Sequence, residues 1–282
     1  MMKILRAEHL GMCFGVRDAI DLAKRQSESG SLTILGDLVH NESVLKSLRQ
    51  HGIAITREVA SVTSKKVMIT AHGASRKAIQ NVRLHGHHVV EATCPLVHRA
   101  HQELHHLVTD GYHPVIVGQR DHVEVKGLTG DLDQFDVILE VEEVANLGVR
   151  KRFGVMAQTT QTIRRVQEIA QAIRDRFSGV EVRVVDTVCQ PTKQRQNAAV
   201  SLARRCDVVV VIGGSQSNNT RQLETTCRRF CPRVVRVQDS GDLRQEWFHQ
   251  DDVVGITAGT STPDSVIDEV QQQLTELFKV IA

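Results

Sequence analysis

Three cysteines share one sequence setting, in which a predicted strand precedes the cysteine and a predicted helix follows it. They are Cys13, Cys94 and Cys189. Pro95 suits the first position of a helix, and the positive end of a helix dipole favours a thiolate. Three thiolates at one point would bind a soft metal centre. Structural zinc sites usually contain close C-x-x-C pairs, whereas these cysteines stand 81 and 95 residues apart.

An iron–sulfur cluster held by three cysteines is the interpretation that we favour. It leaves one iron without a protein thiolate, and that iron can act as a Lewis acid toward a substrate. Two alternatives stay open. One is zinc bound by three cysteines and one histidine; the other is three unrelated buried thiols, because cysteine is often a core residue. The matching strand-end positions argue against the second alternative.

Polar residues that can bind an anion recur on the loops after the predicted strands. They are His40, Asn41, His72, Gly73, His122, Ser217, Asn219 and Ser261. Several of these loops lead into helix N-termini, where backbone N–H groups and hydroxyls hold phosphate oxygens. Each Ser, Thr or Asn alone is more often a helix cap. Their threefold recurrence predicts an anionic substrate, and we expect a diphosphate.

Glu124 is a candidate proton donor, two residues after His122. In an extended segment residues i and i+2 face the same way, so both side chains would enter the pocket together. A carboxylic acid beside a bound hydroxyl is suited to drive loss of water. The alternative is a solvated glutamate paired with Lys126.

The elements that must position these residues alternate between strand and helix throughout the chain, with ten predicted strands and eight predicted helices. The chain also repeats: from Cys13, Cys94 and Cys189 the distances to His40, His122 and Ser217 are 27, 28 and 28 residues. The distances to a second polar loop, at His72, Thr159 and Ser261, are 59, 65 and 72 residues. Loop-length differences explain this drift.

This pattern predicts an α/β protein of three related domains with parallel sheets, at 1–93 (with the N-terminal strand), 94–188 and 189–282. Ligands of open α/β sheets bind outside the carboxyl ends of the strands. Three such ends with one cysteine each predict a trefoil with pseudo-threefold symmetry around a central iron–sulfur site.

Composition excludes several classes of protein. Aromatic residues make up 3% of the 282 residues, too few for base-stacking platforms, and the net charge of +2 gives no general attraction to nucleic acid or membrane. Charged residues appear at Glu8 and His9, too early for a signal peptide, so we expect a cytoplasmic protein, as a monomer or homodimer. Six cysteines in that setting indicate reduced thiols or metal ligands.

Taken together, the motifs resemble those of the 4-hydroxy-3-methylbut-2-enyl diphosphate reductase (LytB) family over essentially the whole chain. The resemblance rests on Cys13 in GMCFGV, His40 in LVHN, His72 in AHGAS, Cys94 in TCPLV, Glu124 in HVEVKG, Thr159 in AQTT, Cys189 in VCQPT, Ser217 and Asn219 in GGSQSNNT, and Ser261 in GTSTPD.

The resemblance implies a 4Fe–4S cluster on Cys13, Cys94 and Cys189, which can become 3Fe–4S on oxidation. It also implies that the substrate hydroxyl binds the open iron near Thr159, and that Glu124, with His122 and Thr159, forms the catalytic group. The diphosphate would be held by His40, His72, His122, Ser217, Asn218, Asn219 and Ser261. Two electrons from flavodoxin or ferredoxin and two protons would then give isopentenyl and dimethylallyl diphosphates, the last step of the methylerythritol phosphate pathway.

Three positions depart from the family pattern. Val123 replaces a usual proline, Gln119 stands where histidine is common, and Asn218 stands where serine or glycine is frequent. None removes a catalytic group, but all three bear on substrate identity. A divergent paralogue acting on another allylic or anionic substrate, and a non-catalytic cluster protein that binds anions, therefore remain alternatives.

Two further groups are interpreted as structural. His98, His101 and His105 recur along one predicted helix; they could bind a divalent metal at an exposed face, but we expect a solvated helix face. Cys206, Cys227 and Cys231 have no counterparts in the other two thirds, so we interpret them as structural or incidental thiols.

Overall fold

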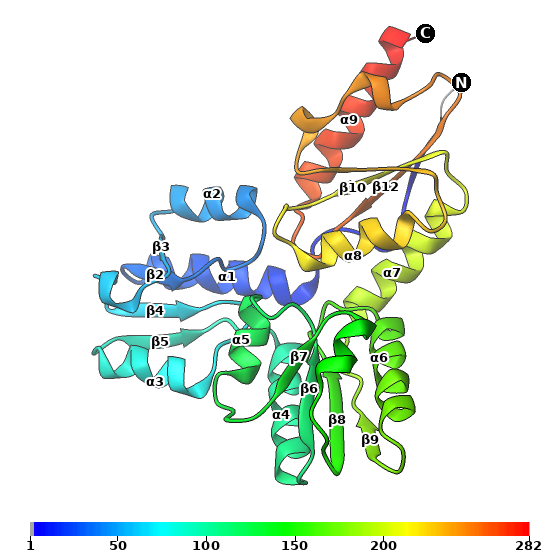
Figure 1. Ribbon diagram of the computed structural model, residues 1–282. Coiled ribbons are helices and arrows are strands. Elements are labelled where there is room, and N and C mark those ends of the chain that lie inside the picture. The colour runs from blue at the N-terminus through cyan, green and yellow to red at the C-terminus, as the bar shows by residue number, and fades with distance from the viewer. Residues whose placement is uncertain (1–2, 282) are drawn as a thin grey trace. The chain divides into compact units, whose positions relative to one another are not determined.

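The computed structural model describes residues 3–281, and strands and helices alternate along this whole range (Figure 1). The strands are β1 (Lys3–Arg6), β2 (Leu32–Leu35), β3 (Ala54–Thr56), β4 (Lys66–Ile69), β5 (His88–Glu91), β6 (His113–Val117), β7 (Asp136–Ile138), β8 (Arg152–Ala157), β9 (Glu181–Val184), β10 (Val208–Ile212), β11 (Arg233–Val237) and β12 (Val253–Ala258). The helices are α1 (Phe14–Glu28), α2 (Glu42–Gln50), α3 (Arg76–Leu84), α4 (Pro95–Thr109), α5 (Val123–Thr129), α6 (Ile163–Arg176), α7 (Gln190–Ala203), α8 (Asn218–Cys227) and α9 (Asp264–Ile281).

Within residues 3–281 the strands form three four-stranded sheets in which all neighbours are parallel. Their orders are β3-β2-β4-β5, β7-β6-β8-β9 and β11-β10-β12-β1. The three orders follow one pattern. The strand order reverses at the middle of each sheet, with two strands on each side, and one edge strand leads to a cysteine. We call each sheet with the helices that cover it a module, and the predicted α/β class with three parallel-sheet modules is confirmed.

The N-terminal strand lies elsewhere than predicted. We predict it in the first domain, but β1 pairs with β12, with Lys3 opposite Val253 and Arg6 opposite Ile256. In the sheet of the first module, the edge strand that leads to a cysteine is β5 instead. The domain boundaries and the trefoil arrangement stay predictions.

Two compact units are distinguished by their internal contacts. The terminal unit comprises the chain up to Val16, His40–Val44 and the chain from Gln190 onward. The central unit comprises Arg17–Val39 and Leu45–Cys189, and so contains two of the three sheets. In the central unit α3 lies along β5 and α4 along β6 and β8 (Figure 1).

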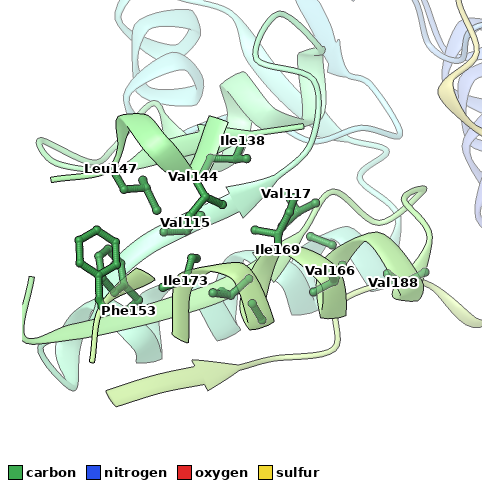
Figure 2. Close-up of a cluster of buried hydrophobic side chains, with 14 residues drawn as sticks. Val115, Val117, Ile138, Val144, Leu147, Phe153, Val166, Ile169, Ile173 and Val188 are labelled. Atoms are coloured by element: carbon green, nitrogen blue, oxygen red, sulfur yellow. The ribbon is translucent and has the colours of Figure 1, made fainter. Parts of the chain in front are cut away.

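Continuous apolar strands explain why helices cover both faces of the sheets. In the terminal unit, Val208, Val210 and Ile212 of β10 pack with α9, whereas Val209 and Val211 pack with α7 and α8. In the central unit, one face of β6 and β8 buries its side chains against α6 (Figure 2). Each fully buried aliphatic side chain stabilises such a core by about 1.5–3 kcal/mol. These cores hold the strand ends that carry the polar loops.

No helix among the described residues combines the length and the apolar character needed to cross a lipid bilayer.

Candidate active site

The three repeated cysteines occupy equivalent places in their modules. Cys13 directly precedes α1, Cys94 is the N-cap of α4 with Pro95 at the first helical position, and Cys189 directly precedes α7. The strands before them, β1, β5 and β9, are all edge strands of parallel sheets. The predicted order of strand, cysteine and helix is confirmed for each.

A repeated backbone hydrogen bond fixes each cysteine to its sheet. In every case the amide donates to the carbonyl oxygen two residues past the end of the neighbouring strand. The bonds run from Cys13 to Thr260 (3.0 Å), from Cys94 to Ala71 (3.1 Å) and from Cys189 to Thr159 (2.9 Å). The three thiols are half-buried. Soft donors in one backbone setting fit a thiolate-bound metal centre.

The other three cysteines lie in a different environment. Cys227 and Cys231 are buried in the core of the terminal unit, and Cys206 packs against it. Burial raises the pKa of the Cys206 thiol to about 11 and that of Cys227 to about 12, and it also raises the pKa of Cys231. These groups remain protonated near neutral pH, which agrees with the structural role predicted for them.

The polar loops follow the two strands at each strand-order reversal, where open α/β sheets bind ligands. The pairs of residues in these loops are His40 and His72 after β2 and β4, His122 and Thr159 after β6 and β8, and Ser217 and Ser261 after β10 and β12.

Two of the predicted anion-binding histidines meet within the central unit. The rings of His72 and His122 lie edge to face, with centroids 5.4 Å apart. His122 Nδ1 accepts a hydrogen bond from the backbone N–H of Glu124 (3.1 Å), so the proton of the neutral ring resides on Nε2. Nε2 is therefore the atom that can donate to an anion.

Glu124 is held by Thr159 in the interior of the central unit. Its carboxylate accepts from the Thr159 backbone N–H (2.6 Å) and from the Thr159 hydroxyl (3.0 Å), and the residue is 1% exposed. Burial raises the pKa of Glu124 to about 7, although both hydrogen bonds act in the opposite direction. A carboxyl group with this pKa can hold and release a proton at neutral pH.

The extended segment predicted around Glu124 is wrong. Val123 begins the short helix α5, His122 is its N-cap, and Glu124 lies in its first turn. Glu124 and His122 are joined by the cap hydrogen bond instead of by strand alternation. The alternative pairing with Lys126 is also wrong, because that ammonium group pairs with Asp121 (3.2 Å).

Hydroxyl and amide groups of the terminal unit gather at the start of α8. Ser217 is the N-cap, and its oxygen accepts from the Thr220 backbone N–H (3.2 Å). The Asn219 side-chain oxygen accepts from the Thr260 backbone N–H (3.0 Å), which ties α8 to the loop after β12. The Ser261 hydroxyl donates to the His40 carbonyl oxygen (3.3 Å).

Close packing leaves no room for a side chain in the loop before α8. A Cβ atom on Gly214 would lie 2.3 Å from the His40 carbonyl oxygen. Asn218, the first residue of α8, is buried, with 2% exposed. Backbone N–H groups at a helix N-terminus are suited to bind an anion, so the start of α8 is a candidate anion site.

Sequence reasoning missed Gln158, which is fully buried at the start of the loop after β8 and contacts the loop after β6. Its Oε1 accepts from the Gln119 backbone N–H (3.2 Å), and its Nε2 donates to the Thr160 hydroxyl (3.3 Å). In the sequence, it could have been identified as a polar residue that stands immediately after an apolar strand and directly before Thr159.

The histidine-rich face of α4 borders a groove in the central unit. The groove has a volume of about 890 Å³ and is also lined by residues of α3. His98 and His105 are exposed, as predicted, whereas His101 is half-buried and burial lowers its pKa.

These features define a class: α/β proteins of three similar parallel-sheet modules, each presenting one thiol and two polar strand-end loops. The chain belongs to the LytB family, because the family model described as "LytB protein" matches residues 4–275. The family resemblance of the sequence motifs is thereby confirmed.

Several relatives match along nearly their full length. The 4-hydroxy-3-methylbut-2-enyl diphosphate reductase of Syntrophotalea carbinolica is 34% identical over 281 residues, which cover 99% of this chain and all of the relative. The enzyme of the same name from Geobacter sulfurreducens is 35% identical over 277 residues, with 98% of each chain covered.

Two solved structures are similar as well. The (E)-1-hydroxy-2-methyl-but-2-enyl-4-diphosphate reductase from Plasmodium falciparum superimposes with a TM-score of 0.90 over 97% of this chain and 88% of the other, and its 24% identity supports the fold alone. The second, described as (E)-4-hydroxy-3-methyl-but-2-enyl diphosphate reductase, the terminal enzyme of the non-mevalonate pathway, has a TM-score of 0.68 and 33% identity, covering 98% of this chain and all of the other.

Proposed function

We propose that this chain is a 4-hydroxy-3-methylbut-2-enyl diphosphate reductase, an oxidoreductase of the methylerythritol phosphate pathway. It removes water from (E)-4-hydroxy-3-methylbut-2-enyl diphosphate with two electrons and two protons, giving isopentenyl and dimethylallyl diphosphates. The observation that carries this proposal is the recurrence of one thiol in the same backbone setting in all three modules. Membership of the LytB family supports the same reaction.

Cys13, Cys94 and Cys189 would hold a 4Fe–4S cluster. Three thiolates suit iron–sulfur ligation, and the absence of a fourth in the set leaves one iron open, which would make the cluster prone to oxidation to 3Fe–4S. When bound, the cluster would pass electrons from the reductant to the substrate and would provide a Lewis-acidic iron.

The loops at the strand-order reversals would hold the diphosphate. His40, His72 and His122 offer imidazole donors, and Ser217, Asn218, Asn219 and Ser261 offer hydroxyl, amide and helix N-terminal donors. Support comes from the proton on His122 Nε2 and from the cap geometry of Ser217. Hydrogen bonds from several such donors to a charged diphosphate are stronger than bonds between neutral groups.

Glu124 would deliver protons, and Thr159 would orient it. Loss of the substrate hydroxyl as water consumes one proton, and the reduced allyl group needs a second. A buried carboxyl with a pKa of about 7 keeps a large protonated fraction at neutral pH, and the Thr159 hydroxyl fixes the direction of its oxygens. His122 anchors the first turn that carries Glu124.

Reduced flavodoxin or ferredoxin would supply the electrons to an enzyme located in the cytoplasm. The proposed reaction involves neither nucleic acid nor a membrane. A non-catalytic cluster protein that binds anions is the competing function. The buried Glu124–Thr159 pair favours the enzyme, because anion binding alone gains nothing from a buried acid whose charged form burial disfavours.

The test is anaerobic purification followed by an assay with a chemical reductant. The protein should be brown and should oxidise reduced methyl viologen when 4-hydroxy-3-methylbut-2-enyl diphosphate is added. A colourless protein after reconstitution with iron and sulfide would overturn the cluster. A brown protein that binds but does not reduce this diphosphate would favour the binding function or a paralogue with another allylic substrate.

A further inference from the structure

Arg195 is a buried arginine in the second turn of α7, with 7% of its surface exposed. Its Nε donates to the Gly11 carbonyl oxygen (2.8 Å), and its Nη1 donates to the Pro191 carbonyl oxygen (3.0 Å). All three residues belong to the terminal unit. One guanidinium group therefore joins the N-terminal segment to the first turn of α7.

Both acceptors stand two residues from a proposed cluster ligand. Gly11 precedes Cys13 by two positions, and Pro191 follows Cys189 by two. Gly11 has a positive φ of +74°, and a Cβ there would lie 2.8 Å from Ile267 Cδ1. The backbone before Cys13 is thus packed on one side and hydrogen-bonded to Arg195 on the other.

The geometry points to Arg195 as a positioning residue that ties two cluster-bearing segments together and places a fixed positive charge beside the cluster. This inference rests on the proposed function. Arginine suits both roles, because its planar group donates in two directions and stays charged at any physiological pH. A nearby positive charge stabilises the reduced, more negative cluster and so raises its reduction potential.

Lysine and glutamine separate the two roles. Arg195→Lys keeps the charge but loses the forked donor geometry, whereas Arg195→Gln loses the charge and keeps a neutral donor. Arg233 is the control: it is partly buried in the same unit and pairs with Asp252 at the amino end of β11. Arg233→Gln should lower stability without touching the cysteine segments.

Each variant is purified anaerobically, reconstituted with iron and sulfide, and measured for iron per chain, thermal midpoint and cluster midpoint potential. We expect Arg195→Gln to shift the potential to more negative values, to lose iron, and to lower kcat by about 10–100-fold, as for outer-shell partners of metal ligands. Arg195→Lys should keep a near-native potential while losing part of its iron. Arg233→Gln should change the thermal midpoint alone.

A loaded Arg195→Gln variant with native iron content and potential would overturn the inference. Equal potential shifts in the lysine and glutamine variants would overturn the role of the charge. If the glutamine variant does not fold, Arg195→Lys decides, because native iron retention there would overturn the positioning role. A wild-type chain that takes up no cluster overturns the proposed function itself, which is a separate outcome.

Discussion

Glu124 is the residue whose chemistry depends most directly on its surroundings. Both carboxylate oxygens accept hydrogen bonds from Thr159, and the side chain is buried away from solvent. Glu124→Gln keeps the volume and removes the transferable proton. We expect turnover to fall by about 10²–10⁴-fold with little change in substrate affinity, measured by viologen oxidation and by binding titration. The exposed Glu142→Gln is the control, and unchanged turnover in Glu124→Gln would exclude Glu124 as the donor.

The same carboxyl group predicts a pH dependence of stability. Its folded pKa of about 7 lies above the ordinary value of 4.5, so the folded chain holds a proton that the unfolded chain releases. The resulting stabilisation is complete below pH 4.5 and is lost as the pH rises through 7. Between pH 5 and 8 the wild type should therefore lose stability relative to Glu124→Gln. Urea unfolding of both at several pH values measures this, and parallel curves would contradict it.

Residue types and spacing were enough to single out candidate chemistry-bearing side chains, but not the residues that they contact. The three cysteines and the strand-end histidines stand out because they recur at similar offsets. The Glu124–Thr159 bonds, the buried Gln158 and the Arg195 contacts join residues 35, 39 and 184 positions apart. Pairings at such separations are made by tertiary packing, which no local pattern encodes.

Helix α5 offers a test of the Val123 departure. Val123 is the first residue of the helix, and His122 has φ −68° and ψ 138°, a conformation compatible with a following proline. Val123→Pro should therefore stabilise the chain by about 0.4–1 kcal/mol through a less flexible unfolded state, and leave turnover unchanged. Thermal unfolding and the reductase assay measure the two effects. Val123→Ala controls for loss of the side chain, and a changed substrate preference would show that this position sets specificity.

Helix α3 is capped from the neighbouring module of the central unit. The Asp131 carboxylate accepts from the backbone N–H groups of Arg76 (2.7 Å) and Lys77 (2.9 Å), at the positive end of the helix dipole. Asp131→Ala should cost about 0.5–2 kcal/mol of unfolding free energy, the usual range for a lost cap. Urea denaturation measures it. The exposed Asp133→Ala should have almost no effect, and equal losses in the two would contradict the capping role.

At the scale of elements, the shortest strands and the shortest α-helix were not predicted from the sequence. Strands β3 and β7 have three residues each, too few to show alternation. Helix α5 has seven residues, includes Gly127, and begins after a histidine cap outside the usual Ser, Thr, Asp and Asn set. The longer strands and helices were predictable because their apolar periodicity extends over enough residues.

Among the described residues, the first strand of the chain, β1, pairs with the last strand, β12. β1 completes the sheet of β10, β11 and β12 in the position that β5 and β9 occupy in the other two sheets. The cysteine offsets revealed the repeat, but this pairing spans some 250 residues and has no local signature. Because β1 is then the counterpart of β5 and β9, Cys13 becomes the structural equivalent of Cys94 and Cys189.

That equivalence makes a prediction for the molecule as a whole. Cys13→Ala, Cys94→Ala and Cys189→Ala should each abolish activity and the visible absorption of the proposed cluster, because each removes one of the three proposed ligands, which share one backbone hydrogen-bond setting. Cys206→Ala, which removes a half-buried thiol of the same chain, should retain both. Iron analysis and absorption spectra after anaerobic reconstitution measure the outcome. A fully loaded, active Cys94→Ala variant would refute the cluster assignment, and a variant series in which only one cysteine matters would refute the equivalence of the three modules.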